Sequence, residues 1–495
     1  MLTFLISLSP VILIFILVVF FKTDILRLSI ISFLYTSCLT FFYFNTDIKI
    51  LLLSSIDGII TTLPILLVVY TGILLSQFLI AKGSLKRLAG IFASSLKNNL
   101  QKALIIGAGF GNFFEGAGVI AEPVVAPMLY TTGLTPEASV ALSILGYSGL
   151  MHLALAGVIV TVLAAVTSIS SEVLSLDLIH LSFPATIFLF LSIPYIIGEP
   201  AFKIKKFFTI IFSAIFINLS ALFTVKFIGF SVSAMLGGVG GIIFLFILFR
   251  LKPVFSKENY KDIIPFVAIF VFLSSINLVP PLKNLFFHKL IFKISVIPVH
   301  IVKIRPLYSA YIYLFICFLI SFKLFAEPSD KLSYYLKTSL QKSYKPIVSM
   351  AIFGAIGSII AFSGLKPDFS AVVKSNNIAF SIANGFIHYT GKFYPVFAPV
   401  LGWMGTFLTG YGIASIMLFG KLQLSTASML GISKSFLASS LTVGASIGSI
   451  SSPFKIALAA PLCNAVGKES SVLKKTIPIG FVIALLVGLY TYIAA

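Results

Sequence analysis

The most constraining feature of this chain is a succession of apolar stretches, each about as long as a membrane-spanning helix. A helix that crosses the hydrocarbon core of a bilayer needs roughly 20 predominantly apolar residues. Clear stretches of this kind are residues 3–21, 28–44, 59–81, 138–168, 178–198, 207–225, 230–249, 262–280, 306–326, 345–363, 377–390 and 473–494. Two more, 103–130 and 396–420, are crowded with Gly, Pro and polar residues. We therefore expect about 12 to 14 crossings.

Composition agrees with a lipid environment. Hydrophobic residues make up 59% of the chain and charged residues 10%, against about half and about a quarter in soluble proteins. This surplus excludes a soluble enzyme, a nucleic-acid-binding protein and a disordered scaffold. The net charge of +20 comes from basic residues in short stretches between apolar runs, which is typical of polytopic membrane proteins. The sequence predicts an all-α, multi-pass protein of the cell membrane.

Two segments of the chain resemble each other. GNFFEGAGVIA at 111–121 aligns without a gap with GTFLTGYGIAS at 405–415. The matched pairs are Gly111 with Gly405, Phe113 with Phe407, Gly116 with Gly410, and Gly118 with Gly412. So many glycines weaken a helix, and irregular backbone at membrane depth survives only where it is buried in protein or lines a cavity. We expect two structural repeats, each with a Gly-rich broken or re-entrant helical hairpin.

These features divide the chain into three parts. The first transport half is expected at 1–250, with its hairpin block at 103–130. A basic connecting and interfacial segment follows at 251–305. The second half is expected at 306–495, with its hairpin block at 396–423.

The end of the connecting segment, residues 281–305, carries basic side chains among Leu, Ile and Phe. They are Lys283, Lys289, Lys293, Lys303 and Arg305. We expect a basic amphipathic helix that lies at the membrane interface and joins the two halves. A ligand-binding role for this segment is the less favoured alternative.

Matching interrupted segments in the two halves are typical of secondary transporters, in which they form a binding site at the repeat interface. Exposed N–H groups at half-helix ends favour an anionic substrate. A membrane-embedded enzyme would need clustered acids, metal ligands or an activated nucleophile, and the sequence shows no such set. We therefore predict a transporter that is not an enzyme, with no cofactor and no metal site.

Ionisable residues inside the membrane are functional candidates because they are costly there. Glu115 and Glu122 fall clearly within an interrupted apolar segment, and Asp57 lies near one end of a span. Glu115 is the first candidate for a proton carrier and Glu122 the second. The alternative is a structural carboxyl that hydrogen-bonds the exposed backbone of the hairpin.

Other polar residues are weaker candidates. His152 lies deep in a long apolar segment and could take part in proton coupling, although a satisfied core histidine is commoner. Lys455 follows a Gly- and Ser-rich stretch, where it could neutralise a substrate carboxylate or extend to the interface. Thr409, Tyr411 and Ser415 offer hydroxyls to a substrate, or bond their own backbone.

Several motifs together resemble the lactate permease family, whose members are secondary carriers of lactate and glycolate. They are FGNFFEGAGVIAEPV (110–124), LGWMGTFLTG with LFGKLQ (401–423), ISSPFKIALAA (450–460) and VGKES (466–470). The resemblance implies a carboxylate carrier driven by a proton gradient, or by sodium, with the hairpin blocks forming the site. Glu115 falls on the family's Glu-Gly position.

The chain departs from the family pattern at several polar positions. The positions that match the family are Gly116, Gly405, Thr409, Gly410 and Ser415. In the second block, the family's Asp and Asn are replaced by Gly412 and Ile416, and an Asn-Thr pair of the first half is replaced by Gly146-Tyr147. Further along, the family's Asn, Lys and Gln are replaced by Leu441, Ser449 and Phe454, while Glu122 is an additional carboxyl. The chain is identified as a divergent member, and its more apolar site favours a longer monocarboxylate.

The function predicted from the sequence is proton symport of an organic monocarboxylate, resembling lactate or glycolate or longer, by alternating access. Candidate substrate-binding residues are Gly116, Gly118, Thr409, Gly410, Tyr411, Ser415 and Lys455; candidate proton-coupling residues are Glu115, Glu122 and His152. Alternatives are a sodium-coupled di- or tricarboxylate transporter, which a second basic group near the site would favour, and an uncoupled anion channel. Expected partners are the small anion, a proton or sodium ion, and the lipid bilayer, and no nucleic acid is expected. A homo-oligomer is compatible with the sequence.

Overall fold

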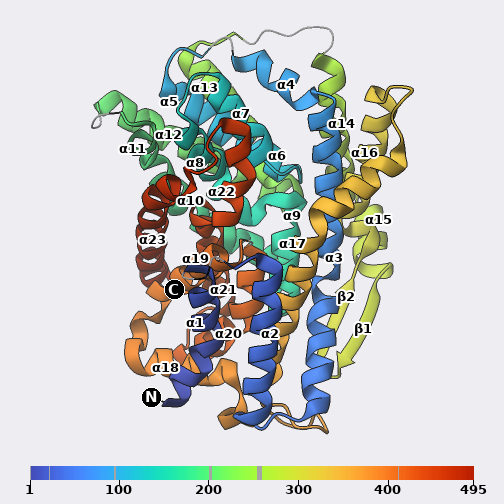
Figure 1. Ribbon diagram of the computed structural model, residues 1–495, viewed down its shortest axis with the longest axis vertical. Helices are drawn as coiled ribbons and strands as arrows, with labels where there is room; N and C mark the ends of the chain where they lie inside the picture. Colours follow the sequence, from blue (N-terminus) through green and yellow to red (C-terminus); the bar gives the residue numbers. More distant parts are fainter. Residues whose placement is uncertain are drawn as a thin grey trace.

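The computed structural model describes residues 2–19, 21, 23–93, 96–199, 203–252, 259–410 and 412–495. Most of these residues are helical (Figure 1). The α-helices are α1 Leu2–Val19, α2 Ile25–Phe42, α3 Ile48–Ala81, α4 Ser84–Ala93, α5 Asn99–Lys102, α6 Gly111–Gly116, α7 Glu122–Thr131, α8 Pro136–Ser148, α9 Ala154–Thr167, α10 Ser171–Leu191, α11 Ile193–Ile197, α12 Ile204–Phe227, α13 Ser233–Phe249, α14 Asn259–Leu278, α15 Pro280–Lys283, α16 Ala310–Phe325, α17 Leu332–Phe362, α18 Ile378–Thr390, α19 Tyr394–Thr409, α20 Gly412–Leu430, α21 Lys434–Gly448, α22 Pro453–Ala459 and α23 Glu469–Ala494. The strands are β1 Phe292–Ile297 and β2 His300–Ile304.

Long apolar helices dominate the described part of the chain. Eight of them are long and apolar enough to cross a membrane, or up to ten if each of two bent pairs is one span. Three shorter apolar helices lie at Leu2–Ile14, Leu26–Phe42 and Ala310–Phe325. The predicted multi-pass helical membrane protein is therefore confirmed, while the number of crossings stays a prediction.

The first hairpin block folds back on itself at a glycine turn. The π-helical segment η1, Ala103–Phe110, continues α5 and leads into α6. The chain then turns at Gly118, which has φ +85°, a backbone conformation that glycine adopts without steric cost. Pro123 stands in the first turn of α7, where its missing N–H costs no helical hydrogen bond. The predicted broken hairpin over 103–130 is thus present.

The second hairpin block has the same general form. α19 ends at Gly410, which has φ +83° and donates its N–H to Thr406. α20 then returns along α19, and Ser415 donates to the carbonyl of Gly402 at 3.0 Å. Tyr411, a predicted substrate-binding residue, lies outside the described residues.

Each hairpin is followed by a sharply bent helix pair. α8 and the segment Met151–Thr167 meet at 59°, and the segments Lys434–Ser451 and Pro453–Cys463 meet at 48°. The apolar stretch predicted as a span at 138–168 is therefore present as a bent helix pair, and its crossing of the membrane stays a prediction. Leu155, Ala156 and Gly157 have consecutive positive φ values of 51°, 52° and 77°, which no continuous right-handed helix can contain.

The connecting segment also differs from expectation. The helix predicted for 281–305 is limited to α15 and a short π-helical turn at Asn284–Lys289, and β1 and β2 then form an antiparallel hairpin. Along β2, buried and exposed side chains alternate, which is the period of a strand rather than of a helix. The hairpin lies beside α3 (Figure 1).

The two bends meet in the interior. α22 packs against α7 and α8 in the interior of the molecule (Figure 1). The hydroxyl of Ser449, at the second bend, donates to the sulfur of Met151, at the first. The hairpin turns and both bends thus come together around one buried region.

Candidate functional site

Glu122, Tyr147 and Lys455 form a buried polar cluster where the bent helices meet. Glu122 is the first residue of α7, directly after the hairpin turn. Tyr147 lies at the end of α8, just before the first bend. Lys455 lies in the first turn of α22, just after the second bend, where the Ser452 side chain accepts its backbone N–H. Each broken element therefore brings one polar side chain to the cluster.

The three side chains are in direct contact. The Lys455 ammonium lies 3.0 Å from Glu122 Oε1 and donates to the Tyr147 hydroxyl at 2.6 Å. That hydroxyl donates in turn to Glu122 Oε1 at 2.5 Å. The side chains of Lys455 and Glu122 are only 7% and 1% exposed. A buried ion pair is tolerated when further hydrogen bonds satisfy it, and Tyr147 supplies these.

The cluster keeps unused hydrogen-bonding capacity. Among the described residues, the second carboxylate oxygen of Glu122, Oε2, has no hydrogen-bond partner although it is buried. An ammonium group has three N–H donors, and two of them are directed at Glu122 and Tyr147. A buried acceptor without a partner is costly in a purely structural ion pair. Glu122 Oε2 can therefore accept one further hydrogen bond.

Glu115 lies next to this cluster. Its Oε2 accepts the backbone N–H of Ala121 at 2.9 Å, across the turn of the first hairpin. The same side chain interacts electrostatically with Lys455 and with Glu122. The structure thus brings together Glu115, Glu122 and Lys455, three residues that the sequence predicted, and Glu115 also bonds the hairpin backbone, as the alternative interpretation expected.

The second hairpin approaches the cluster through its turn. A Cβ atom on Gly410 would lie 2.9 Å from Phe454, the neighbour of Lys455. The Thr409 hydroxyl donates to Gly405 within its own helix, and the Ser415 hydroxyl bonds across the hairpin. These hydroxyls have the backbone partners that the alternative interpretation foresaw, and their contact with substrate stays a prediction.

The remaining predicted residues occupy tightly packed positions. A Cβ atom on Gly116 would lie 2.2 Å from the backbone N of Met235 in α13, so this glycine permits backbone contact between two helices. Gly118 packs against Leu314 and against α3. His152 is buried at the first bend, beside the Leu178 backbone of α10. A direct role for these three in transport stays a prediction.

Tyr147 is a site residue that the sequence did not identify. An isolated tyrosine in an apolar segment is hard to distinguish from a core aromatic residue. The one signal in the sequence is that Tyr147 departs from the pattern of the lactate permease family. A second missed group is the buried pair of Asp57 and His300. His300 Nδ1 lies 2.9 Å from Asp57 Oδ1, and Ser358 donates to the same carboxylate.

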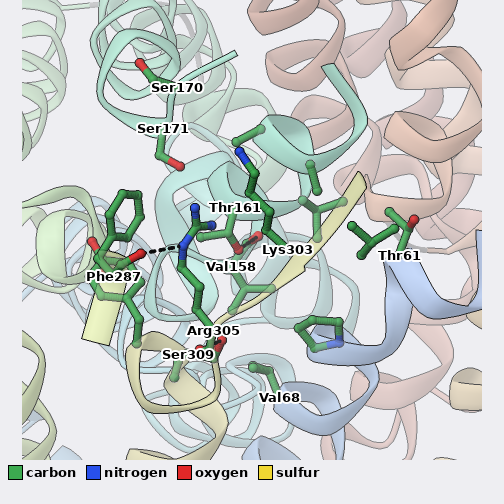
Figure 2. A pocket seen from close by; sticks show the side chains of 18 of the residues that line it. Thr61, Val68, Val158, Thr161, Ser170, Ser171, Phe287, Lys303, Arg305 and Ser309 are labelled. Atoms are coloured by element: carbon green, nitrogen blue, oxygen red, sulfur yellow. Dashed lines mark hydrogen bonds between the residues drawn. The ribbon is translucent and has the colours of Figure 1, made fainter. Parts of the chain in front are cut away.

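A large cavity opens beside this pair. It has a volume of about 350 Å³ and lies between α3, α9 and the β-hairpin. Lys303 and Arg305 face it from β2 and the residue that follows β2 (Figure 2). Lys303 and Arg305, two of the five basic residues that the sequence placed at the membrane interface, therefore line a cavity.

A polytopic helical protein, with an ion pair buried where two broken spans meet, has the organisation of a membrane transport protein. The model of the L-lactate permease family matches residues 3–495. The chain belongs to the L-lactate permease family.

Curated relatives agree with this assignment. An L-lactate permease of Streptococcus iniae is 23% identical over 80% of this chain and 84% of its own length. The L-lactate permease of Escherichia coli is 33% identical over 34% of this chain and 28% of its own length. The glycolate permease of Escherichia coli is 33% identical over 30% of this chain and 24% of its own length. The chain thus matches only about a quarter of the length of the two Escherichia coli relatives.

Proposed function

We propose that this protein carries a small organic monocarboxylate across the cell membrane together with a proton. The observation that supports this most directly is the buried Lys455–Glu122–Tyr147 cluster between the two broken spans. The substrate carboxylate would bind the Lys455 ammonium and the Tyr147 hydroxyl, the groups that now hold Glu122. Relatives named as lactate and glycolate permeases support the substrate class.

Charge balance explains why a proton would accompany the substrate. Glu122 and Glu115 already place carboxylates near one ammonium, so an added anion would be an uncompensated buried charge. A proton on either glutamate removes one negative charge as the substrate brings one. Protonation of Glu122 would also release Lys455 for the substrate, so that proton and anion bind together.

The number of basic groups favours a monocarboxylate. Within the described part of the chain, the Glu122–Tyr147 pair has hydrogen bonds to one cationic side chain, that of Lys455. A di- or tricarboxylate would need further cations to offset its charge. The sodium-coupled di- or tricarboxylate carrier therefore remains the less supported alternative.

We further infer that two repeats alternate in access to this site. Each hairpin is followed by a turn with a positive-φ glycine, Gly133 or Gly431. The hydroxyl of Thr135 or Ser433 then caps the bent helix pair. The same order of hairpin, turn, cap and bend supports the repeat that the matched glycines predicted, and the division into halves at 1–250 and 306–495 rests on it.

Uptake into proteoliposomes tests the proposal. Labelled lactate, glycolate and longer monocarboxylates would be offered with an inward proton gradient, and the wild type is expected to accumulate at least one of them. Two pH units can drive about a hundredfold accumulation for one proton per substrate. Glu122→Gln is expected to abolish accumulation while retaining exchange of labelled for unlabelled substrate, because the amide mimics the protonated carboxyl.

Glu327→Gln is the matched control, since the Glu327 side chain is 70% exposed and its loss should not change accumulation. Accumulation driven by sodium but not by protons would overturn the proton step. No accumulation of any carboxylate under either gradient would overturn the carrier proposal itself.

A further inference from the structure

We propose that the cavity between α3, α9 and the β-hairpin is a second carboxylate-binding site, separate from the Lys455 cluster. It would receive the carboxylate end and the carbon chain of the same class of monocarboxylate, and this identity of the ligand rests on the proposed function. The cavity combines a positioned cationic end, an apolar wall and enough volume for a small organic acid. None of the residues that line this cavity belongs to the Lys455–Glu122–Tyr147 cluster.

Arg305 provides a guanidinium that the protein holds in place. Its Nε donates to the carbonyl of Phe287 at 3.0 Å (Figure 2), and the group lies 4.2 Å from the centre of the Phe287 ring. These two contacts orient the planar group, whose other N–H donors can bind a carboxylate through two parallel bonds. The side chain is half-buried, which strengthens such an interaction.

Lys303 adds a second cation at an electrostatic cost. The hairpin register places it directly opposite Lys293 on β1, and like charges directly opposite in an antiparallel pair destabilise it. Lys303 lines the cavity whereas Lys293 does not. A bound anion would offset the repulsion between the two ammonium groups, which would explain why the hairpin places two lysines opposite each other.

One acidic residue, Glu172, also lines the cavity. Lys283 lies 3.8 Å from its carboxylate, and Glu172 also interacts electrostatically with Arg305, so the charge of Glu172 is shared between these two cations while Lys303 adds a third. Lys303 and Arg305 therefore leave the cavity with a net positive character, which draws small anions into a concave site.

Part of the cavity lining is apolar. Val68 of α3 and Val158 and Val162 of α9 belong to it, and Figure 2 shows Val68 on the side away from Ser170 and Ser171. A carbon chain would bury apolar surface against these side chains, at about 0.8 kcal/mol for each methylene. The chemistry thus fits an amphipathic monocarboxylate better than an inorganic anion.

Equilibrium dialysis of the purified protein in nanodiscs tests this site without transport. Labelled butyrate and hexanoate are the probes, with inorganic phosphate as the competing anion. The wild type is expected to bind two carboxylates per chain, and the double variant Lys303→Gln/Arg305→Gln only one. Affinity at the site lost in the variant should rise about fourfold for each added methylene.

Lys289→Gln is the matched control, because Lys289 is exposed in the same connecting segment, does not line the cavity and should leave both sites intact when its charge is removed. In uptake, the double variant should raise KM about tenfold with little change in the maximal rate, since the Lys455 cluster is unchanged. Binding of two carboxylates to the double variant would overturn the proposal, as would phosphate competing as well as hexanoate. If no carboxylate is transported, dialysis still decides whether the cavity binds one, so failure of the proposed function and failure of this site are distinguishable.

Discussion

At the scale of single residues, breaking the Lys455–Glu122 ion pair should destabilise the protein, because it leaves one buried charge without its partner. Lys455→Met would leave Glu122 without its cation, and removal of one partner from a buried pair costs about 3–5 kcal/mol. The double variant Glu122→Gln/Lys455→Met removes both charges and should recover part of this loss. Thermal unfolding in detergent would measure the difference between the variants.

Lys434→Gln is the control for this double-mutant cycle, because Lys434 is exposed at the start of α21 and its loss should change stability by less than about 0.5 kcal/mol. A double variant no more stable than Lys455→Met would contradict a direct coupling between the two charges.

Residues are predictable from sequence when their chemistry conflicts with their apolar surroundings. Glu115, Glu122 and Lys455 stand out in this way, and the structure brings them together. His300 does not, since it lies in a segment in which basic residues occur among Leu, Ile and Phe, and it becomes buried only when the β-hairpin brings it to Asp57. The two are separated by more than two hundred positions, so no local pattern links them.

At the scale of elements, the first hairpin depends on backbone contact with α13. Gly116→Ala would place a Cβ atom 2.2 Å from the backbone N of Met235, and a backbone atom cannot move aside as a flexible side chain can. Such overpacking costs about 1–3 kcal/mol. A lower unfolding temperature is expected, together with reduced uptake because the hairpin moves away from the cluster.

Gly90→Ala in α4 is the matched control. A Cβ atom there would meet nothing within 4 Å, and alanine is the better helix former. This variant should unfold at the same or a higher temperature than the wild type. Equal effects of the two substitutions would contradict a specific role for the α6–α13 contact.

A second element-scale contact lies at the end of α3. The Lys82 ammonium, just after α3, lies 2.5 Å from the Asp330 carboxylate, just before α17. Its hydrogen bond to Asp330 is the main cause that lowers the pKa of this carboxyl from 3.8 to about 2. Because the folded-state pKa is depressed, the pair stabilises the fold above about pH 4, and this contribution is lost as the pH falls toward 2. Asp330→Asn should remove this part of the acid dependence of the unfolding temperature, whereas Asp368→Asn, in a different loop, should leave the Lys82 contact intact.

Helix breaks and strands are harder to predict from sequence than single site residues, because the apolar residues around them show little periodicity. The hairpin blocks are visible because glycines and Pro123 interrupt apolar runs. The bend after α8 is hidden, since the sequence from 138 to 168 stays apolar through the left-handed residues Leu155 and Ala156. The β-hairpin is hidden as well, since basic residues among Leu, Ile and Phe are also typical of an interfacial helix, and the period of two extends over only the few residues of β2.

At the scale of the whole molecule, the net charge of the proposed substrate and proton together determines how transport responds to voltage. A proton and a monocarboxylate together carry no net charge, so a one-to-one symporter moves none across the membrane. Moving one elementary charge through 100 mV is worth about 2.3 kcal/mol, which would change accumulation about fiftyfold. Accumulation should therefore follow the pH gradient and be insensitive to an imposed membrane potential.

Proteoliposomes with a potassium gradient and valinomycin allow this test, because the potential can be varied at constant pH gradient. With the potential clamped at zero by equal potassium concentrations, the same preparation treated with a protonophore should lose accumulation altogether. A dependence on potential with the inside positive favoured would show that the anion crosses without its proton. That result would contradict the charge balance proposed for Glu115, Glu122 and Lys455, and would favour the uncoupled anion channel instead.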